Sequence, residues 1–340
     1  MTLTSPSPSP SPSPSPSTGR DAVPAAPAAA GTPEVPPWHP SQPHHELAAD
    51  VRWWMGMPLT FGLFGRLALD QVAYREVAAA VDATGRFAEN FTNRGLRSYL
   101  WGPLLLFGDD VDRHATAERL KNLHAGVHGK GKGHFSRERY SALNPAVWKW
   151  VGTSSLLIFY TGYVTTYGRD LDDEQREVVY RTALHLSASD LPSDAAAVPR
   201  TVAEMEAYYE QVATTKLADN EFLQWANQKF DALPVPTLIG PRWLHRLITP
   251  LWRAATPALS RPARVCAAGA AHPRMRELLG ITWTPRLQRE LDLYTALIRL
   301  GRHRLPKWLL LEPLAYNRFR YERLRALYAK PQLTSFAAPD

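Results

Sequence analysis

From about Glu46 onward the sequence forms a succession of helical patterns and almost nowhere a strand pattern. Apolar residues recur at helical spacing, whereas alternating runs of β-branched residues between turn residues do not recur. The expected helices cover residues 61–69, 72–84, 87–106, 112–133, 145–166, 172–187, 201–233, 285–302 and 316–328, with short helices such as 244–255 in the proline-broken stretch 234–273. We therefore predict an all-α fold with a single large helical domain over residues 46–330.

Both ends of the chain differ from this domain in composition. Residues 4–43 contain repeated Ser-Pro pairs and then an Ala/Pro-rich segment. Proline removes backbone donors, and this segment has too little apolar surface to offset the entropy of ordering. We expect a disordered Pro/Ser/Ala-rich tail over residues 1–45 and a short C-terminal tail over residues 331–340. A proline-rich ligand for a partner domain is the functional alternative for the first tail.

The composition limits the classes of partner. With 340 residues, 45% of them hydrophobic, the chain can bury a large core. The formal net charge is +7, but the basic residues are spread along the chain and no basic stripe with interleaved aromatics occurs, so we do not expect nucleic acid as a partner. A single cysteine excludes an intramolecular disulfide and any cysteine-based zinc or iron–sulfur site.

The sequence gives no sign of secretion or of a membrane span. The N-terminus lacks a charged region followed by an apolar one. The longest charge-free run, residues 150–168, contains several Ser and Thr residues and three glycines, which favours a helix buried in protein over one in lipid. We expect a cytoplasmic protein without a transmembrane segment. The sequence does not indicate its oligomeric state.

Residues 112–133 form the best-marked helix of the sequence. Ala117, Leu120, His124 and Val127 fall within one narrow arc, and Thr116 and Leu123 extend that arc to one side. Acidic residues lie at its start, whereas His128, lysines and glycines lie at its end, as the helix dipole and capping preferences favour. We therefore expect His124 to face the core.

A core-facing histidine has several interpretations. It can be a neutral imidazole that hydrogen-bonds to a carbonyl or hydroxyl group, or an axial ligand to a buried iron. His124 and His128, four residues apart, could also share one metal ion. In that case Ala125 stands where a zinc peptidase has glutamate, and no Asp or Glu follows nearby as an obvious third ligand.

Arg94, Arg97 and Ser98 fall at i, i+3 and i+4 of one expected helix and so share a face. They could present two cations and a hydroxyl to a buried anion or a bound oxygen species, or they could form a solvated basic face. The glycine-lysine run 129–133 lacks the preceding strand and the ending of a phosphate-binding loop. No Gly-x-Ser-x-Gly motif occurs, so a serine hydrolase is not indicated.

The order of several short motifs resembles that of the MpaB-type oxygenases and the catalytic domain of latex-clearing proteins, the rubber oxygenases. The motifs are Arg94-x-x-Arg97-Ser98, Phe107-Gly108, Leu123-His124-Ala125-x-Val127, Tyr140-Ser141-Ala142-x-Asn144-Pro145, Trp150-Val151, residues 167–181 and 204–209, and Leu278-Leu279-Gly280-Ile281-x-Trp283-x-Pro285. The resemblance covers nearly everything after the tail.

This resemblance implies an all-helical, globin-reminiscent fold that holds haem b, with His124 as the proximal iron ligand. It places Arg97 at the distal position where some members have lysine, Arg94 at the preceding basic position, and Ser98 at a position of threonine. The chain departs from the family at Gly152, where many members have a second histidine, and at Tyr74, where histidine is frequent. The resemblance does not choose between Glu76, Asp82 and neither as the carboxylate base of polymer cleavage.

The function that follows is a haem b-dependent oxygenase that uses iron-bound O2 or peroxide to oxidise a hydrophobic small molecule, in a biosynthetic pathway. The alternative is a non-catalytic haem or ligand-binding helical protein. A third interpretation is a metal-free interaction protein whose tail docks a partner. Aromatic residues of the 150–167 helix, with Tyr208 and Tyr209, are candidates for the pocket wall or for the core.

Overall fold

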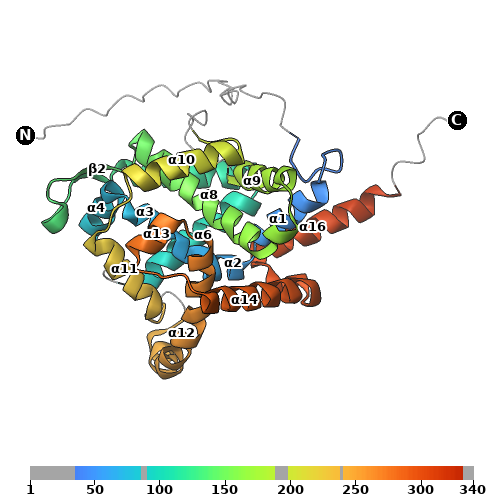
Figure 1. The fold of residues 1–340 in the computed structure, drawn as a ribbon. Coiled ribbons are helices and arrows are strands. Elements are labelled where there is room, and N and C mark those ends of the chain that lie inside the picture. Colours follow the sequence, from blue (N-terminus) through green and yellow to red (C-terminus); the bar gives the residue numbers. More distant parts are fainter. Residues whose placement is uncertain (1–34, 86–89, 188–197, 238–239, 332–340) are drawn as a thin grey trace, which may run out of the picture. The chain divides into compact units, whose positions relative to one another are not determined.

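The computed structural model describes residues 35–85, 90–187, 198–237 and 240–331 (Figure 1). The chain divides into two units, Met1–Val35 and Pro36–Asp340, and the described helices belong to the second. Residues 1–34 of the expected N-terminal tail and residues 332–340 of the C-terminal tail lie outside the described residues. Trp38, which belongs to the expected tail, packs edge-on against His185 and beneath the guanidinium of Arg52.

The second unit is helical almost throughout its described residues, which confirms the all-α prediction (Figure 1). In chain order the helices are α1 (His45–Met55), α2 (Pro58–Phe64), α3 (Leu69–Ala73), α4 (Arg75–Thr84), α6 (Phe91–Phe107), α7 (Asp110–Ala125), α8 (Pro145–Tyr167), α9 (Asp173–Ser187), α10 (Val202–Thr215), α11 (Glu221–Asp231), α12 (Arg242–Ala270), α13 (Pro273–Leu278), α14 (Pro285–Arg304), α15 (Lys307–Leu310) and α16 (Pro313–Ala329). The short 3-10 helices are η1 (Gly65–Ala68), η2 (Gly133–Phe135) and η3 (Gly168–Asp170).

Helix α8 lies at the centre of the described core. Asn144 caps its start, and Pro145 occupies the first helical position, where the missing N–H has no intrahelical partner to lose. Helices α1, α2, α3, α9, α12 and α14 all pack against it. Trp150 and Leu156 are at most 2% exposed, so the charge-free run is buried in protein, as predicted. None of the described helices combines the length and the apolarity needed to cross a membrane.

Helix α7 ends earlier than the sequence pattern predicted. It stops at Ala125, not near residue 133, because Gly126 follows it and Val127 turns back to donate to the carbonyl of His124. The next residues form a small antiparallel hairpin, in which β1 (His128–Lys130) pairs with β2 (Arg139–Ser141). The prediction that the helix continues through His128 was therefore wrong.

Helix α12 corrects a second prediction. It runs for 29 residues through Pro250, Pro257 and Pro262, where we expected short helices broken by proline. The hydroxyls of Thr249 and Thr256 donate to carbonyls one turn earlier, at 2.5 and 2.7 Å, which supplies hydrogen bonds next to the missing proline donors. Cys266, the one cysteine, lies near the end of this helix; it is fully buried, and burial raises its pKa to about 12.

The expected helix 201–233 is two helices, α10 and α11. They are separated because Leu217 pairs with Tyr74 in an isolated bridge and Ala218 donates to the carbonyl of Ala73. Asn220 then caps α11 by accepting from the backbone of Leu223 at 2.9 Å. These contacts hold α10 and α11 near α3, where one wall of a cavity forms.

Candidate functional site

Helices α6 and α7 form a helical hairpin that places the predicted site residues. Asn90 caps α6 and Asp109 caps α7, each through its side-chain oxygen. Gly108 joins them, and a Cβ there would lie 2.3 Å from the carbonyl oxygen of Leu104, so the turn requires glycine. The two helices pack against each other, with Arg119 lying over the ring of Trp101.

His124 lies in the last turn of α7, half-buried. Its Nδ1 lies 2.9 Å from the carbonyl oxygen of Leu120, so Nδ1–H donates to its own helix and Nε2 is left as the second ring nitrogen. The ring of Trp148 packs edge-on against it, with centroids 5.3 Å apart. Burial lowers the pKa of His124, the hydrogen bond to Leu120 opposes this, and the charge of Arg94 lowers the pKa further. The imidazole is therefore neutral at pH 7.

The apolar arc expected on α7 is present in part. Thr116 is buried, and Ala117, Leu120, His124 and Val127 are half-buried, as the spacing predicted. Leu123 was expected to extend this arc but is 54% exposed, so that part of the prediction was wrong. The face of α7 that carries Leu123 is turned to solvent.

The three residues predicted on α6 differ in their surroundings. Arg94 is half-buried and close enough to His124 to shift its pKa. Arg97 and Ser98 are exposed, and neither has a hydrogen bond or ion pair within the described part of the chain. The structure thus brings Arg94 and His124 together and leaves Arg97 and Ser98 on the open side of the hairpin.

The other candidates considered from the sequence lie elsewhere. His128 is exposed on β1, so His124 and His128 do not share a helix. Nowhere in the described ranges do three or more His, Cys, Asp or Glu residues gather closely enough to hold a metal ion. The Glu76 carboxylate accepts a hydrogen bond from Asn144 at 3.4 Å, and Asp82 is exposed.

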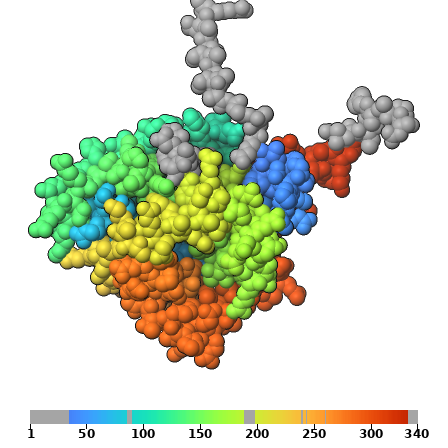
Figure 2. Space-filling view, turned by 45° about the horizontal axis from the view of Figure 1, so that its top comes forward, coloured from blue at the N-terminus to red at the C-terminus, as the bar shows by residue number. Residues whose placement is uncertain are grey.

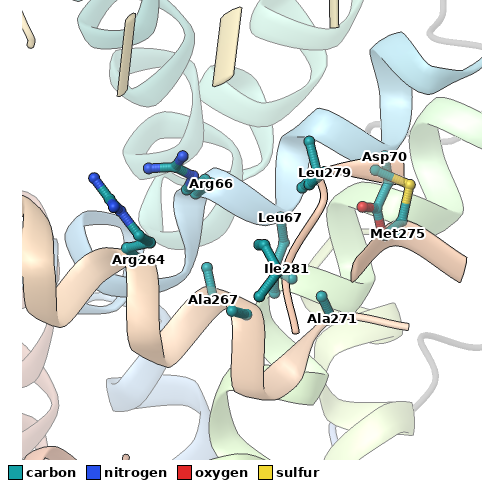
Figure 3. A pocket seen from close by; sticks show the side chains of 10 residues that line it. Arg66, Leu67, Asp70, Arg264, Ala267, Ala271, Met275, Leu279 and Ile281 are labelled. Carbon is teal, nitrogen blue, oxygen red and sulfur yellow. The ribbon is translucent and has the colours of Figure 1, made fainter. Parts of the chain in front are cut away.

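A cavity that sequence reasoning missed lies between η1, α3, α8, α10 and the end of α12. Its volume is about 320 Å3, and Figure 2 shows a hollow where the yellow surface of α10 meets green and orange surfaces. Asp70 lies between this cavity and a water-sized one of about 10 Å3, where Figure 3 shows it beside Met275. We call the larger space the Asp70 cavity.

Asp70 is the unusual group of this cavity. Burial raises its pKa to about 7, although Tyr209 donates a hydrogen bond of 2.5 Å to its carboxylate. The signal in the sequence was a lone carboxylate within the apolar run 67–73, which we did not single out. Tyr209 and Tyr160 line the cavity, whereas Trp150 packs in the core.

The fold and the site define an all-helical domain in which one helical hairpin carries a neutral histidine within the electrostatic influence of an arginine. A family model described as "ER-bound oxygenase mpaB/B'/Rubber oxygenase, catalytic domain" matches residues 51–300. The chain belongs to this oxygenase family, as its motifs indicated. Comparison with curated proteins and with solved structures finds no match.

Proposed function

We propose that the domain over residues 46–330 is a haem b-dependent oxygenase that oxidises a hydrophobic small molecule, with His124 as the axial iron ligand. The observation that carries this proposal is the orientation of the His124 imidazole in a chain of this family. Nδ1–H is held by Leu120, so Nε2 is the nitrogen that can bind iron. A hydrogen bond from the other ring nitrogen to a carbonyl is the usual support of a metal-binding histidine.

The donor set around His124 fits a haem. The lowered pKa keeps the imidazole neutral, which is the form that binds iron. Arg94 and Arg97 supply cations that can pair with the propionate carboxylates. An added Cβ at Gly95 or Gly102 of α6 would meet no atom within 4 Å, so open space lies beside the helix where a flat ring could approach.

Other side chains of α6 would serve oxygen activation and substrate binding. When bound, haem supplies a redox-active iron that can activate dioxygen or peroxide. Arg97 and the Ser98 hydroxyl would donate hydrogen bonds on the α6 side. Leu100 and Leu104 follow Arg97 at helical spacing and are 55% and 40% exposed, so they offer apolar surface to a hydrophobic substrate.

The test is the absorption spectrum of the full chain expressed with a haem precursor. We expect a Soret band in the wild type that is lost in His124→Ala. His128→Ala is the matched control, because His128 is an exposed histidine four residues away, and it should keep the band. A colourless wild type, or a His124→Ala variant with the wild-type spectrum, would overturn the proposal.

The exposure of Arg97 and Ser98 is the observation that favours the alternative, a non-catalytic haem protein. A distal site for oxygen is normally enclosed, and these two side chains are open to solvent. Consumption of peroxide or reductant by the haem-loaded chain separates the two functions. The oxygenase predicts turnover that falls strongly in Arg97→Ala while the Soret band remains. A haem-loaded wild type without turnover supports the alternative.

A further inference from the structure

The Asp70 cavity is separate from the His124 site in its residues and in its construction. None of the residues that line it belongs to α6 or α7. Its apolar walls include Leu67, Leu157 and Met205, each at most 6% exposed. A volume of about 320 Å3 is within the range of small-molecule sites, which combine apolar walls with a few polar groups.

Apart from His272, the ionisable groups that line the cavity among the described residues are carboxylic acids and tyrosines. Asp70 lies at its inner end and is 6% exposed, whereas Glu206 and Glu210 on α10 are exposed. No lysine or arginine is found among the described residues that line it. This contrasts with the formal net charge of +7 of the whole chain. The cavity is therefore a local acidic region on a basic protein.

The two arginines that line the small pocket with Asp70 do not pair with it. Arg66 and Arg264 border the small pocket on the other side of Asp70, and Figure 3 shows their guanidinium groups at the far end of that pocket. Both pair with Asp231, each at 2.7 Å. Among the described residues Asp70 has a neutral hydrogen-bond donor, Tyr209, and no ion-pair partner.

A line of contacts connects the inner carboxyl with the outer end. Tyr209 donates to Asp70, and its ring lies against the ring of His272 with centroids 4.9 Å apart. His272 Nε2 lies 2.9 Å from a carboxylate oxygen of Glu210. Tyr209 thus holds the Asp70 carboxylate in place, and His272 holds that of Glu210. Each carboxyl group therefore has one hydrogen-bond partner within the cavity lining.

We propose that the Asp70 cavity binds an organic cation, a small molecule with an apolar body and an ammonium group that pairs with Asp70. A buried carboxylate is costly unless a charge pairs with it, and no charged partner for Asp70 is found in the described part of the chain. The apolar walls would hold the body of the ligand, and Glu206 and Glu210 would favour entry of a cation. The proposal does not depend on haem.

The experiment measures binding of 4-phenylbutylamine to the full chain by calorimetry, with 4-phenyl-1-butanol as the neutral probe of similar shape. We expect one saturable site for the amine and at least tenfold weaker binding of the alcohol. Asp70→Asn keeps the acceptor for Tyr209 and should weaken amine binding at least tenfold. Asp173→Asn is the matched control: it makes the same charge change at an exposed position of α9 and should bind as the wild type does.

If Asp70→Asn folds poorly, amine binding can still be tested with a second variant and by its pH dependence. Glu210→Gln at the exposed end should weaken the amine several-fold. Because ionised Asp70 is the partner, amine affinity should rise about tenfold from pH 6 to pH 8. The other titratable or charged groups near Asp70 are Tyr160, Glu206, Tyr209, Glu210 and His272 in the cavity and Arg66 and Arg264 beyond it.

Of these groups His272 contacts both Tyr209 and Glu210, so His272→Gln tests whether it contributes to the pH dependence. The rise with pH should persist in His272→Gln and vanish in Asp70→Asn. Three results would each overturn the proposal: no saturable binding of the amine, equal binding of amine and alcohol, or wild-type affinity in both Asp70→Asn and Glu210→Gln. Loss of the Soret band in His124→Ala has no bearing on any of them.

Discussion

The His124 site and the Asp70 cavity differ in how far apart in the sequence their residues lie. The surroundings of His124 come from the hairpin of α6 and α7 and from the start of α8, all between Arg94 and Trp148 in the sequence. The cavity is built from residues between Leu67 and His272, on five elements. The hairpin has an open side, where Arg97 is exposed, whereas Asp70 is nearly fully buried.

The two regions therefore depend on different parts of the sequence. Local signals, the caps and the helical spacing, place His124, because the hairpin forms from consecutive residues. The Asp70 cavity exists only when distant helices have packed. Substitutions in the cavity should therefore act on the stability of the whole domain, whereas substitutions in the hairpin should act locally.

The largest expected effect is that of Asp70→Asn on the pH dependence of stability. Below about pH 4 Asp70 is protonated in both the native and the unfolded state. Between pH 4 and 7 the unfolded state releases this proton and the native state keeps it, because burial raises the pKa to about 7. The free energy of unfolding of the wild type therefore falls as pH rises through this window, by about 4 kcal/mol from Asp70.

Denaturant unfolding of the wild type and of Asp70→Asn at several pH values measures this contribution. The difference between the two free energies should change across the window in favour of the variant. Asp173→Asn makes the same charge change at an exposed position and should not show this change in favour of the variant. If the difference for Asp70→Asn did not change with pH, the Asp70 carboxyl would be as accessible to water as an exposed one. The Asp70 cavity and the α6–α7 hairpin would then not differ in burial.

An intermediate effect is expected for Asp109→Ala at the start of α7. The Asp109 side chain accepts from the backbone N–H of Asp112 at 2.8 Å, and loss of such a cap costs about 1 kcal/mol. Amide hydrogen exchange should become faster in the first turn of α7 and stay unchanged around Asp70. Asp110→Ala, next to the cap and fully exposed, should cost less. Faster exchange in both regions would mean that hairpin and cavity unfold together.

The smallest effect is expected for Leu123→Ala on the exposed face of α7. Its side chain is 54% exposed, so its removal should change the free energy of unfolding by less than about 0.5 kcal/mol. Leu120→Ala, on the half-buried face of the same helix, should cost more. Equal losses of unfolding free energy in the two variants would show that the face carrying Leu123 is buried in solution as well.

Much of the fold follows from local physics and could be predicted. Helices α7 and α14 begin at side chains that cap them, Asp109 and Thr284, and their apolar residues keep helical spacing. The predictions for residues 201–233 and for residues 234–273 failed because a distant contact or a side-chain hydrogen bond decided the outcome. The bridge between Tyr74 and Leu217 divides α10 from α11, and the hydroxyls of Thr249 and Thr256 help α12 continue through its prolines.

The candidate sites show the same division. His124 could be singled out because its place in the arc, its helix and the neighbouring motifs are all local. The exposure of Arg97 and Ser98 was not predictable, because helical spacing gives the shared face and not what covers it. Asp70 was missed because the cavity around it is formed by α10 and α12, which are more than a hundred residues away in the sequence.

The state of Cys266 has a practical consequence for studying both regions. A thiol that is fully buried, with its pKa raised to about 12, is almost entirely in the unreactive protonated form and is shielded from reagents. A cysteine introduced at an exposed position, such as Leu123→Cys, can therefore carry a maleimide dye or a spin label while the native residue stays in place. Motions of the hairpin can then be followed spectroscopically in an otherwise unaltered chain.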